Sequence, residues 1–240
     1  MYPPRVTFAT IFAAAFLAAT PLVSGTGATP AKAVVSIGPA TDVPLDVGVR
    51  LSIEGPRRVR LSTSVGILPD PYLDIINAAA VEAGAYDEET AKIVERSLRS
   101  SLVWRTHVGW RAWRGLYVGA GYGLVGLGGS VAGEDLFTVA TGTPPPAGEI
   151  GGNRKYSVKS MIHMADVEVG WEWRIRSFAV RSAVGFAYTF DARTEVEPEY
   201  RPLFPQVVER YEREMEAYLD SIYESYVHSP VLTISAGWTF

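Results

Sequence analysis

The last ten residues of the chain, Val231 to Phe240, alternate between large apolar and small polar side chains. The apolar positions are Leu232, Ile234, Ala236, Trp238 and Phe240. The positions between them are Thr233, Ser235, Gly237 and Thr239. Because successive side chains of a strand point to opposite faces, this pattern predicts a strand with one apolar and one polar face.

Six further segments alternate in the same way, at residues 45–54, 58–67, 102–112, 116–127, 165–175 and 178–191. Each has about ten residues, the length of a tilted transmembrane strand and about twice that of the mean globular strand. A soluble β-sandwich also alternates, but its polar faces seldom combine so much glycine with charge. The pattern therefore favours an all-β fold, an antiparallel up-and-down transmembrane β-barrel.

Aromatic side chains lie near the ends of these segments, where aromatic girdles meet lipid headgroups. They are Trp104, Trp110, Trp171, Trp173, Tyr188, Phe190 and Trp238. Short connections at 55–57, 113–115 and 176–177 alternate with long ones at 69–100, 128–160 and 192–229. Outer-membrane barrels have short periplasmic turns and long outer loops, so we expect the long connections to face outward.

A closed bacterial barrel needs an even number of strands, and the seven clear segments leave one unaccounted for. The candidate for the missing strand is Val34 to Gly38, which is short and is followed by Pro39 and Pro44. We predict an irregular first strand there, giving eight in all. The alternative is a tail that threads the lumen.

Two of the long connections show helical periodicity. Apolar residues fall on one helical face in 70–84, in 88–99 after Asp87, and in 204–226. We predict helical insertions at about 70–99 and 204–226, either packed as a lid on the barrel rim or forming a cap that binds a ligand or protein partner. Residues 143–155, rich in proline and glycine, predict a mobile loop.

The N-terminus has the pattern of a secretory signal peptide. Arg5 precedes an apolar run from Val6 to Val23, and Ala31-Lys32-Ala33 forms a cleavage site. We predict a signal peptide over 1–33 and a mature barrel over 34–240, with an earlier site at 24–28 and a retained anchor as alternatives. Cleavage near Ala33 removes Arg5 and Lys32 and no acid, so 20 of 22 basic residues face 26 acidic ones, a net charge of about −6.

This composition excludes several classes of function. An acidic chain without a basic block is a poor nucleic-acid binder. The chain has no cysteine, so it has no disulfide, thiolate metal site or lipidated N-terminal cysteine. Beyond the signal segment, no stretch approaches the roughly 20 apolar residues of a spanning helix, so a mature membrane protein must span as a closed barrel.

The polar faces of the predicted strands place charges inside the barrel. The predicted lumen network comprises Asp46, Arg50, Glu54, Arg58, Arg60, Arg105, His107, Arg111, Asp166, Glu168, Glu172, Arg174, Arg181 and Asp191. The interior of an eight-stranded barrel is just wide enough to be filled by side chains or to hold one small ligand. Unpaired buried charges are costly, so we expect these groups to pair and fill the lumen; a conducting pore is the alternative.

Candidate chemistry is sparse. His163 and His228 lie near the outer ends of their segments, with Ser157, Ser160 and Ser229 nearby, so a Ser–His hydrolase is one hypothesis. No nucleophile motif such as G-x-S-x-G supports it. No histidine pair has ligand spacing, so neither a metal nor another cofactor is predicted. The alternating glycines of 119–128 predict a crowded strand interior and no phosphate loop.

An amphipathic C-terminal strand that ends in an aromatic residue resembles the last strand of bacterial outer-membrane β-barrels, here of the small eight-stranded type. The resemblance implies an outer-membrane location in a diderm bacterium, lipid around the barrel, and recognition by periplasmic chaperones and the barrel-assembly machinery. The assembly signal would include Gly237, Trp238 and Phe240. Our first hypothesis is a non-enzymatic barrel with a structural, adhesive or ligand-binding role. A narrow passage for small or apolar molecules is the second hypothesis, and a barrel hydrolase is the third.

Overall fold

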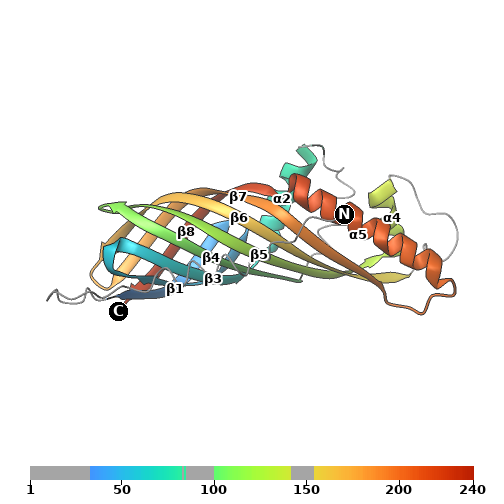
Figure 1. Cartoon of the computed structure of the whole chain (residues 1–240), viewed down its shortest axis with the longest axis horizontal. Coiled ribbons are helices and arrows are strands. Elements are labelled where there is room, and N and C mark those ends of the chain that lie inside the picture. The colour runs from blue at the N-terminus through green and yellow to red at the C-terminus, as the bar shows by residue number, and fades with distance from the viewer. Residues whose placement is uncertain (1–32, 83, 85–99, 142–153) are drawn as a thin grey trace, which may run out of the picture. The chain divides into compact units, whose positions relative to one another are not determined.

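A computed structural model describes residues 33–82, 84, 100–141 and 154–240. Eight antiparallel strands pair in sequential order and close into a barrel (Figure 1). The predicted all-β, up-and-down barrel of eight strands is therefore confirmed. The predicted signal peptide, apart from Ala33, lies outside the described residues and stays a prediction.

The strands differ greatly in length. They are β1 Val34–Val43, β2 Asp46–Glu54, β3 Val59–Ile67, β4 Ser100–Trp113, β5 Leu116–Ala132, β6 Lys155–Ile175, β7 Phe178–Pro198 and β8 His228–Thr239. All seven segments predicted from alternation are strands. However, β5, β6 and β7 run on past their predicted outer ends, so parts of two predicted long loops are strand.

The first strand is more regular than predicted. β1 has ten residues and pairs with β2 from Val34 to Asp42, for example at Ile37 with Leu51. It also pairs with β8 on both sides of Pro39, at Ile37 with Trp238 and at Ala40 with Ser235. Pro39 supplies no N–H to a ladder, yet the strand continues through it. The alternative of a tail in the lumen is wrong.

The connections at one end of the barrel are tight and carry arginine. The short helix η1, Pro56–Arg58, joins β2 to β3. Arg57, Arg114 and Arg176, one in each of the three turns, have φ values of 70°, 47° and 55°. The C-terminus lies at this same end (Figure 1). The opposite end holds one tight turn, Pro44–Leu45, and the three long connections.

Helices occur in all three long connections. They are α2 Asp70–Glu82, α4 Gly133–Thr141 and α5 Pro205–Tyr226. The predicted helices over 70–84 and 204–226 are confirmed, whereas α4 was not predicted. The second predicted helix, over 88–99, lies outside the described residues, as does the predicted loop over 143–155 except its last two residues. None of the helices in the described ranges has the length and apolar character needed to cross a membrane.

The extended parts of β5, β6 and β7 continue the barrel sheet beyond the other strands and are covered by α4 and α5 (Figure 1). Tyr156 and Val158 of β6 and Val196 of β7 are buried there against Val208 and Tyr211 of α5. β7 pairs with β8 only as far as Tyr188 with His228, so its outer part is an edge strand. α5 covers this edge, and the Glu216 carboxylate accepts the Val196 N–H at 3.1 Å. We call α2, α4, α5 and this sheet extension the outer cap.

Candidate functional site

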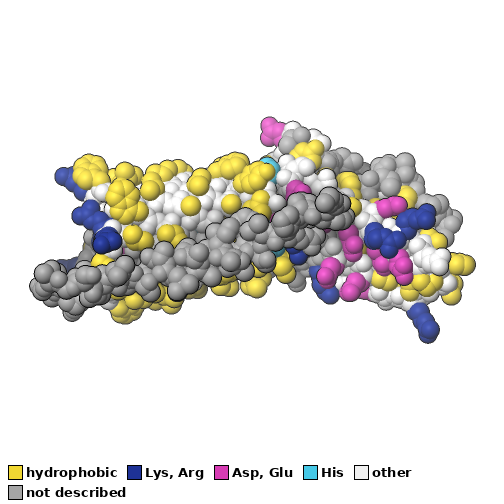
Figure 2. Space-filling model, viewed as in Figure 1, with side chains coloured by type: hydrophobic (Ala, Val, Ile, Leu, Met, Phe, Trp, Pro, Cys, Tyr) yellow, Lys and Arg dark blue, Asp and Glu magenta, His cyan; other side chains and the backbone are white. Residues whose placement is uncertain are grey.

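The outside of the barrel is apolar. Leu102, Val167 and Val184 each expose about three fifths of their surface, at 58%, 61% and 58%. The exposed strand residues of this apolar belt also include Ile37, Val47, Val49, Leu51, Ile53, Val65, Trp104, Val108, Trp110, Val118, Val169, Trp173, Phe186, Leu232, Ile234 and Trp238. Figure 2 shows hydrophobic side chains gathered along the barrel, with basic residues at the turn end and both acidic and basic residues over the cap.

The inside of the barrel is ionic. Arg50, Arg105 and Arg181 are at most 4% exposed, and the carboxylates of Asp166, Glu168 and Glu172 are buried beside them. This distribution is the reverse of a soluble protein, in which arginine and glutamate are rarely buried unless paired. In β2 to β7 the apolar face therefore points outward and the polar face points into the lumen, as the sequence predicted.

Near the tight turns, two glutamates hold the network together. Glu54 of β2 accepts hydrogen bonds from Arg60 at 2.8 Å, from Arg111 at 2.5 Å and from Arg174. Glu172 of β6 accepts from Arg174 at 2.6 Å and from Arg60. Three arginines, from β3, β4 and β6, therefore share two carboxylates, one on β2 and one on β6. These ion pairs link opposite sides of the barrel wall across the lumen.

Further up the lumen, Asp42 of β1 binds Arg50 and Arg105, each at 2.6 Å, and accepts a hydrogen bond from Thr233 of β8 at 2.5 Å. Asp166 of β6 contacts the same Arg105 at 3.1 Å and His107 at 2.8 Å. Asp42 has 0% exposure and is the most buried acid of the set. A charge at that depth is tolerated because cations and a hydroxyl surround it.

Arg181 of β7 forms a further ion pair in the lumen. Its guanidinium pairs with Glu168 and lies over the Tyr117 ring, 4.0 Å from the ring centroid. The ion pair and the cation–π contact together hold the group between β5, β6 and β7.

The glycines of β5 make room for these side chains. A Cβ at Gly121 would lie 2.5 Å from His107 Cδ2 and 2.9 Å from the Asp166 carboxylate. A Cβ at Gly119 would lie 3.3 Å from Glu168 Oε1. The His107–Asp166 contact therefore depends on a strand that leaves this space empty.

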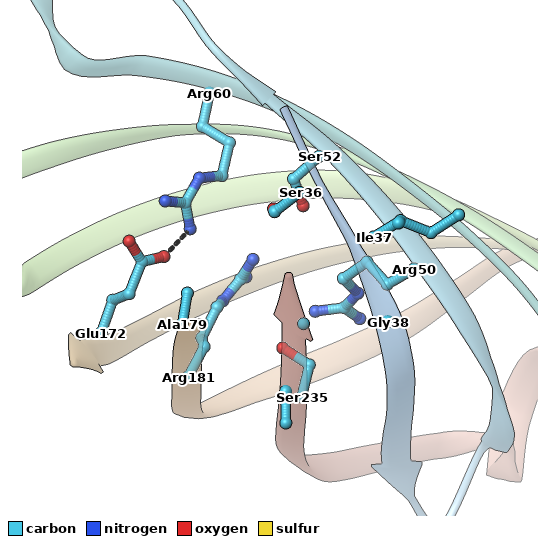
Figure 3. Close-up of a pocket in the computed structure, with 12 residues that line it drawn as sticks. Ser36, Ile37, Gly38, Arg50, Ser52, Arg60, Glu172, Ala179, Arg181 and Ser235 are labelled. Carbon is cyan, nitrogen blue, oxygen red and sulfur yellow. Dashed lines mark ion pairs between the residues drawn. The ribbon is translucent and has the colours of Figure 1, made fainter. Parts of the chain in front are cut away.

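A small cavity lies in the network (Figure 3). It measures about 30 Å³, and Arg50, Arg60 and Arg181 point toward it among Ser36, Ser52 and Ser235. That space is enough for a water molecule or two. Toward the outer end, the lumen is filled instead by apolar side chains, including Val103, Ile162 and Met164, with Leu73 of α2 and Tyr223 of α5 packed on them.

The structure differs from the prediction at three network residues, two of them in position and one in pairing. Arg58 lies exposed in the turn helix η1, so it is not in the lumen. Asp191 faces outward, and its carboxylate lies 3.5 Å from the exposed Arg193. Asp46 is inside and 1% exposed, but neither of its carboxylate oxygens has a hydrogen-bond partner among the described residues. It lies opposite Asp42 across the β1–β2 turn.

Asp42 was missed because Pro39 interrupts the apolar pattern and the predicted strand stopped at Gly38. A usable signal was present, since Ser36, Gly38, Ala40 and Asp42 share one parity and lead directly to the turn before Asp46. Asp191 was misplaced for a different reason. The register between β6 and β7 shifts after Met164–Thr189, so that His163 pairs with Asp191 and Phe190 is the extra residue of a β-bulge.

The polarity of the two faces reverses along a line across three neighbouring strands. In β6 the apolar residues face outward from Ala165 to Trp173, whereas Tyr156, Val158, Ile162 and Met164 face inward. In β5 the inward positions change from Gly119, Gly121 and Gly123 to Val125, Leu127 and Val131. In β7 the bulge at Phe190 makes the change. These positions are cross-strand neighbours, so they form one inversion line between the barrel and the cap.

Both outer histidines lie on the outside near this line, and each is engaged by an aromatic residue. His163 Nδ1 lies 2.6 Å from the Tyr122 hydroxyl, and Phe190 packs near both rings. His228 stacks on Tyr188 at 4.5 Å, and its Nδ1 accepts the Thr189 N–H. Within the described residues, neither histidine is bonded to a serine. The same part of the chain holds no group of three His, Asp or Glu placed to bind a metal.

The acidic face of α5 carries the main electrostatic feature of the cap. Burial raises the pKa of Asp220, and Glu224 and Glu216 add to the rise, while hydrogen bonds from Thr194 of β7 oppose it. Burial likewise raises the pKa of Glu212, together with the neighbouring Glu216 and Glu209. The helix therefore packs on β7 with carboxylates that repel one another.

The predicted assembly residues lie at the seam between the first and last strands. Trp238 is 61% exposed and packs edge-on against Phe178 at 5.4 Å. Phe240 is 78% exposed, and its N–H donates to the Val35 carbonyl at 2.8 Å. Gly237 and Gly38 approach so closely that a Cβ on Gly38 would collide with the backbone of β8.

No protein-family model matches the chain, and no curated protein matches it in sequence. Solved structures of similar fold include a major outer membrane protein of Thermus thermophilus, 13% identical, covering 87% of this chain and 98% of that one, with a TM-score of 0.42. Acinetobacter baumannii CarO2 and CarO are each 13% identical with TM-scores of 0.36; each covers 86% of this chain, and the alignments span 99% and 97% of theirs. At this identity the likeness concerns the fold alone.

Proposed function

We propose that this protein is an integral β-barrel of the outer membrane of a diderm bacterium, with lipid around its apolar belt and a lumen closed by side chains. One observation carries the proposal. The barrel exposes apolar side chains and buries ionised ones, and this arrangement reverses at the inversion line. A barrel bathed in water throughout would have no reason to reverse, whereas hydrocarbon favours apolar side chains on the outside.

The inversion line then marks the outer boundary of the hydrocarbon. Tyr122, His163, Phe190 and Tyr188 lie there on the outside, as expected of side chains at headgroup level. Below the line, the tight arginine turns face the periplasm. Above it, the cap faces the cell exterior, where its acidic helix meets water.

A closed lumen makes the role structural or surface-binding, with the outer cap as the working surface. Support comes from the filled interior, with the ion network below and the apolar cluster above it. Assembly through periplasmic chaperones and the barrel-assembly machinery, with Gly237, Trp238 and Phe240 as the signal, belongs to the same proposal. Catalysis has no support from the contacts of His163 and His228.

Two measurements test the proposal on the full-length mature chain. Boiled and unboiled samples should migrate differently on a detergent gel, because the folded barrel resists the detergent until heated. Planar bilayers should show no conductance steps, because the lumen is filled. Identical migration would exclude the membrane barrel, whereas reproducible steps would exclude the closed lumen and favour a narrow passage.

A further inference from the structure

A large apolar groove lies at the outer end of the barrel, beside the apolar cluster that fills the lumen there. Its volume is about 510 Å³, within the range of roughly 300–1,000 Å³ that is typical of ligand sites. Four places in the fold meet there, one of them the β1–β2 turn at Val43, Pro44 and Leu45. The wall of β7 and β8 contributes Val184 and Leu232, α2 contributes Ile76 and Ala79, and the end of α5 contributes Tyr226.

The chemistry of the lining selects hydrocarbon. None of the fifteen described residues that line the groove is an Asp, Glu, Lys or Arg. Two of the polar groups in the lining already have partners, since Ser229 Oγ donates to the Pro230 carbonyl and His228 Nδ1 accepts the Thr189 N–H. A charged ligand would lose its hydration there without gaining a charged partner.

The groove is continuous with the apolar belt. Val184 and Leu232 are cross-strand partners, they line the groove, and they expose 58% and 42% of their surfaces as belt residues. Val43, at the end of β1, is paired with the same Leu232 and also lines the groove. Ile75 of α2, 49% exposed, lies on the same lining. Lipid that contacts the belt therefore reaches the groove without crossing a polar barrier.

We infer that the groove binds a hydrocarbon chain of an outer-leaflet membrane lipid, held between the β7–β8 wall and helix α2. This inference rests on the proposed membrane location and assigns a ligand class to the outer cap. The chain lies against Val184 and Leu232, and Ile76 and Ala79 of α2 cover it. The headgroup stays outside, because the lining offers it no charged partner.

Photo-cross-linking tests the site in the full mature chain. The protein is reconstituted in vesicles of phosphatidylethanolamine and phosphatidylglycerol that contain a trace of phosphatidylcholine with a diazirine in its acyl chain. After illumination, labelled residues are mapped by mass spectrometry. We expect label on Ile76 and Ala79 as well as on Val184 and Leu232. Label on the belt without label on α2 would overturn the groove, whereas an unlabelled belt would overturn the membrane location itself.

A matched pair of variants sharpens the result. Ala79→Trp should fill the groove and reduce the label on Ile76 several-fold, while labelling of belt residues that do not line the groove, such as Val108, stays unchanged. Ala78→Trp makes the same change on an adjacent exposed position that does not line the groove, and it should leave the label on Ile76 as in the wild type. Unchanged labelling of Ile76 in Ala79→Trp contradicts the inference. If that variant does not fold, the wild-type map alone decides.

Discussion

At the scale of single residues, the stability of the lumen depends on buried charges that pair with one another. Glu168 and Arg181 are both deeply buried and pair with each other, whereas Asp191 lies outside and contacts only the exposed Arg193 among the described ion pairs. Pairs of the first kind are costly to break, because the remaining charge stays buried. Pairs of the second kind are worth little, because water screens them.

Glu168→Gln should therefore lower the free energy of unfolding by about 3 kcal/mol, because Arg181 loses the carboxylate that balances it. Asp191→Asn is the control and should change stability by less than about 1 kcal/mol. Urea unfolding of the barrel in lipid vesicles measures both. Equal effects of the two substitutions would mean that the network is not a tightly paired interior.

The glycines of β5 give a second test at this scale. Gly121→Ala should cost about 1–3 kcal/mol, because the new methyl group pushes against His107 and Asp166. Gly128→Ala on the same strand has nothing within 4 Å of the new Cβ and should be nearly neutral. The same unfolding measurement applies. A neutral Gly121→Ala would show that the His107–Asp166 contact does not need the space.

At the scale of elements, helix α5 covers a strand edge that no other described strand pairs with. The outer part of β7 has no β8 partner, and an exposed strand edge invites pairing with other chains. α5 covers that edge and supplies Glu216 and Asp220 to β7. The cover has an electrostatic cost, because the carboxylates of α5 lie close together.

Asp220→Asn should strengthen this cover at neutral pH. Since the pKa of Asp220 is raised in the folded cap, folded Asp220 holds its proton more tightly than the unfolded chain does. The free energy of cap unfolding therefore falls as pH rises from the ordinary aspartate range through the raised pKa. The asparagine removes this loss and can still accept from Thr194.

Hydrogen exchange of the Thr194 and Val196 amides measures the effect. Exchange in Asp220→Asn should be several-fold slower than in the wild type at pH 7, and the two should converge at acidic pH. Glu214→Gln, on an exposed position of the same helix, should leave exchange unchanged. Faster exchange in Asp220→Asn at pH 7 would contradict the sign of the effect.

At the scale of the whole molecule, two environments share one continuous set of strands. Below the inversion line β6 faces outward with valine and tryptophan, and above it the same strand faces outward with Lys159, whose side chain is 62% exposed. If lipid surrounds the belt, the free-energy cost of a charged side chain on the outer face should depend on its depth in the bilayer. That cost is highest at the midplane and falls toward the interfaces.

Val167→Arg should accordingly destabilise the barrel in vesicles by about 2–4 kcal/mol. Met161→Arg lies on the same strand and face but close to the inversion line, and it should cost about 0–1 kcal/mol. Both wild-type side chains are about half exposed or more, so burial does not explain a difference. Equal costs at the two positions would argue against lipid around the belt.

Much of the barrel could be predicted from the sequence, because each strand carries its own period of two. Alternation located β2 to β8, assigned the outward face of residues such as Val108 and Val167, and placed Arg105 and Glu172 inside. Helical periodicity likewise located α2 and α5. These features are local: the side-chain period of an element is set by its backbone and is visible within about ten residues.

Only the tertiary structure decided what depends on neighbouring strands. The bulge at Phe190 turns Asp191 outward, and pairing on both sides carries β1 through Pro39 to the buried Asp42. In the sequence, the alternation of β6 changes parity at Met164 and Ala165, which resembles the end of a strand. In the structure, β6 stays paired with β5 and β7 on both sides of this point, so the strand continues. The pairing of one strand with another leaves no periodic pattern in the sequence. The ion-pair partners of each charged residue and the length of each strand are therefore set only when the strands pair and the barrel closes.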